Sequence, residues 1–255
     1  MVLDKLQLKV VDYMTPNPIV VKPCLKLIDA IAIMAKKKIG NVIVNDEKGN
    51  PSSILTEREI LIYLVKDGGI PDIEMKKVQT KPFSSVSPDS LVLDAAKTMI
   101  EKKKRLLVFD DGKLVGIITA SDMLRGLRTT GGNPPLEKVV SAKVYRCEYF
   151  DSIFKAVNLM LKKRIGSILI VKNDLPFGIF TERDLLQVLT KNVPLQERLA
   201  NYSTYPLITA KYGIKGNDAA EIMSKNKIKR LVLKKNDQIV AMVTARDIVD
   251  AFRIM

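Results

Sequence analysis

The chain has 255 residues, of which 47% are hydrophobic and 27% are charged, the balance of an ordinary globular protein. It contains no histidine, which excludes Ser-His and Cys-His nucleophile pairs and every histidine-ligated metal site. The two cysteines, Cys24 and Cys147, are too far apart for a CxxC motif, so we expect a reduced, cytoplasmic protein. No apolar stretch approaches the roughly 20 residues of a membrane-spanning helix, so no membrane partner is expected.

The first predicted unit runs helix, strand, helix, strand, strand, helix. After a short helix, Met14–Val21 carries two prolines and is predicted to be a strand. Ala30 and Met34 follow one helical turn apart and therefore share one face of a helix. Val42–Val44 is a short run of β-branched residues, which favours a buried strand. A polar turn then leads to a second strand. That strand runs into Thr56, where the last helix begins.

The same unit recurs three more times along the chain. The segments that end the second strand read ILTERE, IITASD, IFTERD and MVTARD. Their threonines, at successive intervals of 63, 62 and 63 residues, are Thr56, Thr119, Thr181 and Thr244. Four similar motifs at nearly equal spacing indicate an internal repeat.

A unit of about 60 residues is marginally stable alone, so the four units are expected to pair. The clearest linker is Arg128–Pro135, which reads RTTGGNPP and separates the second unit from the third. We therefore predict an α/β protein with two modules, residues 1–128 and 135–255.

The threonine motif carries the candidate chemistry. A threonine at a helix start offers a hydroxyl and nearby backbone N–H groups, which suit a phosphate. A carboxylate three residues later can accept hydrogen bonds from the two ribose hydroxyls of a nucleotide. The same Thr-x-x-Asp/Glu pattern is also a helix capping box, so the motif alone leaves both interpretations open.

The repeat resembles the CBS (cystathionine-beta-synthase-like) domain family, above all in Gly116–Asp122 and Gly178–Asp184. The resemblance implies repeats at residues 7–66, 73–128, 135–191 and 194–255. It implies tandem pairs, often called Bateman modules, stacked as a disc within one chain, with a homodimer as the alternative. It also implies adenosine ligands such as AMP, ADP, ATP or S-adenosylmethionine.

The resemblance further implies that each motif faces the first strand, and the start of the second strand, of a partner repeat. The resulting binding sets are Thr181 and Asp184 with Ser203–Ile208, Ile228, Lys229 and Arg230; Thr119 and Asp122 with Thr15–Val20, Ile39, Gly40 and Asn41; and Thr244 and Asp247 with Ser141–Arg146, Ile165 and Gly166.

We expect Thr181 and Asp184 to form the strongest site, because the motif is complete and the facing repeat offers Lys229 and Arg230. We expect the first motif, Thr56 with Glu59, to be the weakest, because it lacks the glycine and the longer side chain should push the carboxylate outward. The resemblance would place it opposite residues 79–84 and 104–106.

The function indicated is a regulatory adenine-nucleotide sensor that signals to an unknown effector protein, with no redox or metal cofactor. One alternative is nucleic-acid binding, because residues 128–255 carry a net charge of +10 against +4 for residues 1–127. A second is a scaffold that binds no ligand. An enzyme is disfavoured, because the sequence shows no P-loop, nucleophile elbow or metal-ligand cluster.

Overall fold

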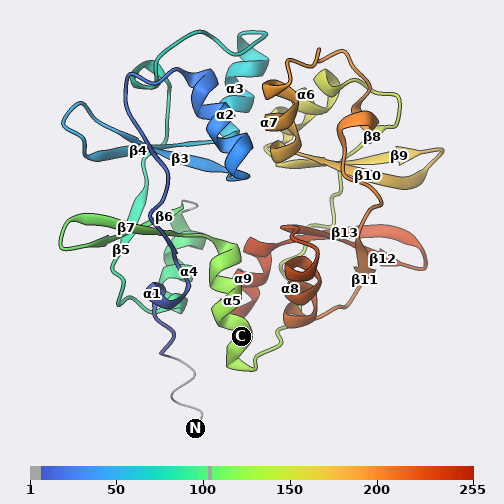
Figure 1. Ribbon diagram of the computed structural model, residues 1–255. Coiled ribbons are helices and arrows are strands. Elements are labelled where there is room, and N and C mark those ends of the chain that lie inside the picture. The colour runs from blue at the N-terminus through green and yellow to red at the C-terminus, as the bar shows by residue number, and fades with distance from the viewer. Residues whose placement is uncertain (1–6, 103–104) are drawn as a thin grey trace. The chain divides into compact units, whose positions relative to one another are not determined.

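A computed structural model describes residues 7–102 and 105–255 (Figure 1). The chain divides into two compact units, each built from both halves of the sequence. Unit 1 contains the segment that ends at Pro18, together with Phe83–Val144 and Ile208–Met255. Unit 2 contains Ile19–Pro82 and Tyr145–Leu207. The compact units therefore differ from the expected modules 1–128 and 135–255, since unit 1 holds most of repeats two and four and unit 2 most of repeats one and three.

Unit 2 contains two three-stranded sheets, in the orders β2-β3-β4 and β10-β9-β8. In each, the first strand runs parallel to its neighbour and the last two strands form an antiparallel pair. The strands are β2 (Val20–Val21), β3 (Asn41–Asn45), β4 (Pro51–Thr56), β8 (Arg146–Glu148), β9 (Ser167–Lys172) and β10 (Leu175–Thr181). The helices are α2 (Leu27–Lys37), α3 (Glu57–Lys66), α6 (Ile153–Lys163) and α7 (Glu182–Thr190).

Unit 1 contains a four-stranded sheet in the order β1-β7-β6-β5 and a three-stranded sheet in the order β11-β12-β13. The strands are β1 (Thr15–Pro16), β5 (Ser84–Val86), β6 (Leu106–Asp110), β7 (Lys113–Ile118), β11 (Thr209–Lys211), β12 (Arg230–Lys235) and β13 (Gln238–Thr244). The helices are α1 (Val10–Tyr13), α4 (Val92–Lys102), α5 (Ala120–Leu127), α8 (Gly216–Lys225) and α9 (Ala245–Arg253).

Helix packing explains why repeats far apart in the sequence share a unit. In unit 2, α2 packs against α7, and in unit 1, α5 packs against α9 (Figure 1). Ala30 and Met34, predicted to share a helix face, are both fully buried. Leu186 of α7 is buried in the same core cluster as these residues. The apolar helix face of one repeat is therefore covered by a repeat from the other half of the chain, which removes apolar surface from water.

The segment before the first repeat is not the single strand predicted for Met14–Val21. Thr15 and Pro16 pair with Ile117 and Gly116 of β7 in the second repeat, whereas Val20–Val21 pairs with β3 of the first. Between the two strands, Asn17 has a φ of 49°, which ends the extended conformation. The first repeat thus adds an edge strand to the sheet of the next repeat.

The predicted linker is anchored to unit 1 rather than spanning open solvent. The side-chain oxygen of Asn133 accepts a hydrogen bond of 2.8 Å from the backbone N–H of Asn217. The side-chain amide of Asn217 in turn donates to the carbonyl of Gly132 at 2.6 Å. Lys215, at the N-cap of α8, makes no side-chain capping bond. The backbone N–H of Asn217, in the first turn, has no partner within the helix, and Asn133 supplies one from the linker.

Candidate functional site

All four threonine motifs lie where a strand runs into a helix, and all four form capping boxes. At Thr181, the backbone N–H and the hydroxyl both donate to Oδ2 of Asp184, at 2.8 and 2.7 Å. At Thr244, both donors lie 2.8 Å from Oδ2 of Asp247. The capping interpretation is therefore confirmed for every copy, and it occupies one carboxylate oxygen. A ribose would have to use the second oxygen.

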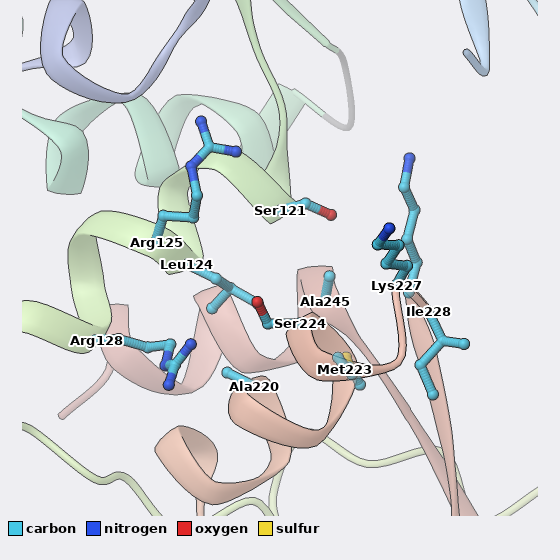
Figure 2. Close-up of a pocket in the computed structure, with 11 residues that line it drawn as sticks. Ser121, Leu124, Arg125, Arg128, Ala220, Met223, Ser224, Lys227, Ile228 and Ala245 are labelled. Atoms are coloured by element: carbon cyan, nitrogen blue, oxygen red, sulfur yellow. The ribbon is translucent and has the colours of Figure 1, made fainter. Parts of the chain in front are cut away.

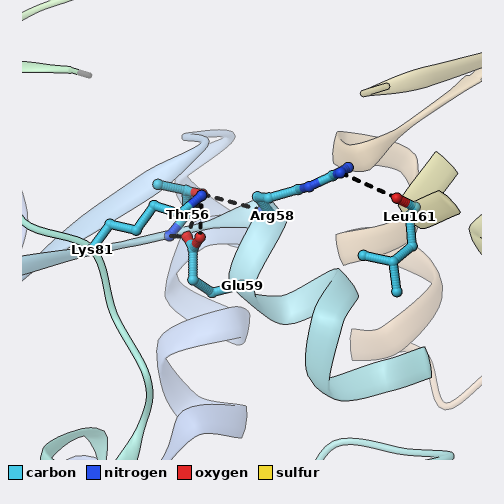
Figure 3. A network of polar contacts seen from close by, with 5 residues as sticks. All are labelled: Thr56, Arg58, Glu59, Lys81 and Leu161. Atoms are coloured by element: carbon cyan, nitrogen blue, oxygen red, sulfur yellow. Dashed lines mark hydrogen bonds and ion pairs between the residues drawn. The ribbon is translucent and has the colours of Figure 1, made fainter. Parts of the chain in front are cut away.

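The second carboxylate oxygen has a charged partner in the first and second motifs. Oδ1 of Asp122 accepts a hydrogen bond of 2.8 Å from the guanidinium of Arg125. In the first motif, Oε1 of Glu59 forms an ion pair of 2.9 Å with Lys81 (Figure 3). The expectation that Glu59 pushes its carboxylate outward is wrong, because the residue is only 3% exposed. Its longer side chain instead folds back, so that Oε2 completes the cap of Thr56.

The fourth motif presents a different electrostatic environment. Burial raises the pKa of Asp247 above that of an ordinary aspartate, against the opposing effects of the Thr244 hydrogen bonds and of Arg246. The hydrogen bonds from Thr244 both reach Oδ2. A ribose hydroxyl that donated to Oδ1 would therefore bind a partly desolvated carboxylate.

The glycine that precedes two of the motifs has a structural role that the sequence did not reveal. A Cβ atom at Gly178 would lie 2.7 Å from the carbonyl oxygen of Thr204. This close approach exists because Ile179 and Thr204 exchange two backbone hydrogen bonds, of 3.0 and 2.9 Å. Gly116 is similarly crowded by Met14. The glycine therefore admits the first segment of the neighbouring repeat.

The sequence profile of the CBS domain matches this chain four times, at residues 10–66, 75–129, 136–191 and 199–254. The chain belongs to the CBS domain family. Each match contains one threonine motif with its two preceding strands and the helix that follows. The resemblance stated from the motifs is thus confirmed.

Two similar proteins come from methane-producing archaea. MJ1225 of Methanocaldococcus jannaschii is 27% identical over 197 residues, which cover 69% of this chain and 70% of that protein. MK0525 of Methanopyrus kandleri is 38% identical over 95 residues, which cover 36% of this chain and 48% of that protein. A crystal structure of MJ1225, described as a candidate archaeal homologue of g-AMPK, aligns with a TM-score of 0.81 at 18% identity, over 96% of this chain and 100% of that one. The structural likeness shows the shared fold of four CBS repeats.

The structure brings together only part of each predicted binding set within a unit. Thr181, Asp184 and Ser203 belong to unit 2, where Ser203 lies beside Gly178. Thr119, Asp122 and Thr15 belong to unit 1, as do Thr244 and Asp247. The first residues of Ser141–Arg146 also belong to unit 1 with Thr244. The following members belong to the opposite unit from their motif, and their roles stay predictions: Ile208, Ile228, Lys229 and Arg230; Val20, Ile39, Gly40 and Asn41; Arg146, Ile165 and Gly166.

Lys229 and Arg230 lie at the start of β12 within the fourth CBS repeat. Arg230 pairs with Thr244 across β12 and β13. The carbonyl of Lys229 accepts a hydrogen bond of 3.0 Å from the N–H of Ala245. The predicted cations are therefore next to the motif of the fourth repeat. Lys104, expected opposite the first motif, lies outside the described residues.

Sequence reasoning missed an arginine inside the CBS motif. Arg58, two residues after Thr56, donates to the carbonyl of Met160 at 3.2 Å and to that of Leu161 at 3.3 Å. Figure 3 shows the contact with Leu161. These carbonyls lie at the C-terminal end of α6 in the third repeat. Arg246, at the equivalent position of the fourth motif, donates to the carbonyls of Met99 and Ile100 of α4. The repeated letters TER and TAR were the available signal.

The described part of the chain shows no group of three or more Cys, Asp or Glu side chains placed to hold a metal ion. Across the same residues, no helix is long and apolar enough to cross a membrane.

Proposed function

We propose that this CBS protein is a cytoplasmic, non-catalytic regulator that binds AMP, ADP or ATP and signals to an effector protein. Its functional units are the CBS repeats at residues 7–66, 73–128, 135–191 and 194–255. Asp247 supports the proposal, because both hydrogen bonds from Thr244 reach Oδ2 and a ribose hydroxyl can donate to Oδ1.

In repeats three and four, three groups of residues recognise different parts of the nucleotide. Asp184 accepts hydrogen bonds from the ribose, and a charge-assisted bond of this kind contributes about 1.5–3 kcal/mol. Thr181 and the nearby N–H groups hold the first phosphate. Lys229 and Arg230 set the preference for further phosphates, since the arginine fork suits bidentate phosphate contacts. Binding then alters the packing between repeats, and the effector reads that change.

Calorimetric titration with adenosine, AMP, ADP and ATP tests the proposal. Asp184→Ala should weaken all four ligands by a similar factor, whereas Arg230→Ala should weaken ATP and ADP more than adenosine. The matched controls are Asp174→Ala, in the turn between β9 and β10, and Lys235→Ala, at the end of β12, which remove exposed charges. If Arg230→Ala leaves the phosphate preference unchanged, the site assignment is wrong.

Salt dependence separates this function from nucleic-acid binding, which the net charge of +10 in residues 128–255 favours. Binding to a polymer should lose affinity steeply as salt rises, in proportion to the phosphates contacted. A mononucleotide in a pocket should respond less. A protein that binds duplex or single-stranded nucleic acid but no nucleotide would overturn the proposal.

A further inference from the structure

Unit 2 carries four aromatic rings in one connected series. The ring of Tyr149 meets those of Phe150 and Phe177 edge to face, with centroids 5.0 and 4.8 Å apart. Phe177 in turn stacks on Tyr205, with centroids 5.2 Å apart. All four residues belong to unit 2, and they come from the turn after β8, from β10 and from the segment that follows the third repeat.

Leu175 adds an aliphatic side chain to this series. It lies next to the turn of the β9–β10 hairpin (Figure 1). Leu175 pairs across the hairpin with Lys172, and cross-strand partners project their side chains from the same face. The Lys172 ammonium lies 4.8 Å from the centroid of the Tyr149 ring. The four rings and Leu175 form the aromatic patch.

The aromatic patch is exposed to a degree that is rare in this chain. Phe150 and Leu175 are each 69% exposed, and Tyr205 is 64% exposed. Apart from the C-terminal Met255, they are the three most exposed large hydrophobic side chains among the described residues. Apolar patches rimmed by polar groups mark interaction surfaces.

The fold of a repeat does not require these side chains. The position of Leu175, six residues before the motif threonine, is polar in the other repeats, where it is Asn50, Lys113 or Gln238. The counterparts of Tyr149, Phe150 and Phe177 are Pro23, Cys24 and Ser52; Pro88, Asp89 and Val115; and Tyr212, Gly213 and Val240. Only one of them is aromatic, and yet all four repeats form the same arrangement of strands. The patch therefore indicates a role other than folding.

Charged groups of both signs surround the patch. The guanidinium of Arg198 lies 4.9 Å from the centroid of the Phe150 ring, and Lys172 supplies the second cation. Asp151 is paired with Lys155. Three exposed carboxylates, which within residues 7–102 and 105–255 form no ion pair, adjoin Tyr149, Leu175 and Arg198 in the chain: Glu148, Asp174 and Glu197. These carboxylates offset the two cations, so the patch does not suit a polyanion such as nucleic acid.

A second copy of this chain has a surface that fits the patch. In a two-fold dimer the same surface is used on both sides, so it must be complementary to itself. Exposed rings fulfil this condition, because aromatic rings pair favourably with one another. Phe150 and Tyr205 provide one such ring at each end of the series. The unpaired charges fulfil it as well, since the cations of one copy can face the carboxylates of the other.

We propose that two copies of this protein associate through the aromatic patch of the third repeat to form a closed two-fold dimer. The rings and Leu175 of one copy pack against those of the other. Lys172 and Arg198 of each copy pair with carboxylates across the contact.

The aromatic patch is separate from the threonine motifs. In unit 1, residues of two motifs, Ser121 and Ala245, line a cavity of about 220 Å³ between α5 and α8 (Figure 2). The patch lies in unit 2, and only Tyr205 falls within a segment predicted to face a motif. Phe150 and Leu175 belong to no predicted binding set, so they can be changed without altering the proposed nucleotide sites.

Sedimentation velocity over a wide range of protein concentrations tests the dimer. The wild type should associate reversibly, and Phe150→Ser/Leu175→Gln should raise the dissociation constant at least tenfold. The matched control Val11→Ser/Ile254→Gln, which removes two exposed apolar side chains from unit 1, should change it less than twofold. Circular dichroism checks that both double variants are folded. A wild type that stays monomeric, or equal losses in the two variants, would overturn the proposal.

Charge reversal tests the two-fold arrangement. Lys172→Glu/Arg198→Glu leaves the patch with negative groups only, and Glu148→Lys/Asp174→Lys/Glu197→Lys leaves it with positive groups only. Each variant alone should be monomeric, because like charges then face each other. An equimolar mixture should form a heterodimer. A mixture that stays monomeric would show that the cations of one copy do not face the carboxylates of the other, against the proposal.

Two binding measurements distinguish the dimer from other uses of the patch. Phe150→Ser/Leu175→Gln should bind AMP as the wild type does, whether or not the nucleotide proposal holds. Loss of AMP binding in this variant would assign the patch to the nucleotide site and contradict the dimer. A monomeric wild type that binds a single-stranded oligonucleotide, with binding lost in the variant, would assign the patch to nucleic acid instead.

Discussion

At the scale of single residues, the carboxylates of the four motifs differ in what surrounds them. Asp122 is paired with Arg125 and Glu59 with Lys81, whereas burial raises the pKa of Asp247. A raised pKa in the folded state means that ionisation of Asp247 costs stability. That cost is absent below the unfolded pKa of about 3.9 and appears as pH rises through the folded value.

We therefore expect Asp247→Asn, which keeps an acceptor for Thr244, to be at least as stable as the wild type at pH 7. The difference should shrink as the pH falls towards 4. Asp122→Asn is the matched control and should lose up to about 1 kcal/mol at pH 7, because it breaks the pair with the half-exposed Arg125. Urea unfolding at several pH values measures both. An Asp247→Asn protein less stable than the wild type at pH 7 contradicts the prediction.

The two thiols should differ sharply in reactivity. Cys24 is exposed, whereas Cys147 is buried, and desolvation raises the pKa of Cys147 to about 11. Since the thiolate is the reactive form, we expect a disulfide reagent at pH 8 to modify one thiol in the native protein and two in urea. Cys24→Ser should abolish the native reaction. Rapid native labelling of that variant would show that Cys147 is accessible.

At the scale of elements, the glycine before the motif controls whether neighbouring repeats can pair. Gly178→Ala should destabilise the protein by about 1–3 kcal/mol, because its Cβ would collide with the Thr204 carbonyl. Gly69→Ala is the control, since a Cβ there meets nothing within 4 Å, and it should be neutral or slightly stabilising. Equal effects of the two variants in urea unfolding would rule out the close-approach explanation.

The capping arginine should stabilise the contact between helices of different repeats. Arg58→Ala removes its hydrogen bonds to the end of α6 and is expected to cost about 1.5–3 kcal/mol. Arg58→Lys should recover only part of this, because an ammonium lacks the planar fork that reaches the carbonyls of Met160, Leu161 and Ile165. Urea unfolding of the two variants and the wild type measures the effect. If Arg58→Lys is as stable as the wild type, the positive charge of Arg58, and not its planar guanidinium, stabilises the contact.

At the scale of the whole molecule, each compact unit takes segments from both halves of the chain. Residues 1–130 and 131–255, expressed separately, should expose the helix faces that α7 and α9 cover and should self-associate. Expressed together, they should co-purify as a one-to-one complex, because those faces then find their native partners. Light scattering and circular dichroism check this. A monomeric, stably folded half would contradict the arrangement.

The repeat and the order of its elements were predictable from the sequence, because hydrophobic periodicity and turn residues are local signals. Thr56 and its three counterparts marked the helix starts, and the capping box is a contact across three residues. The resemblance to CBS domains rested on the same local motif. These features depend on residues near one another in the chain.

Only the tertiary structure decided which repeats share a core, what crowds Gly178 and what the motif arginines contact. Each of these depends on packing between segments up to about 150 residues apart, such as Gln187 and Ala35. An apolar helix face in the sequence indicates that it will be buried but not by which partner, because the hydrophobic effect is non-directional.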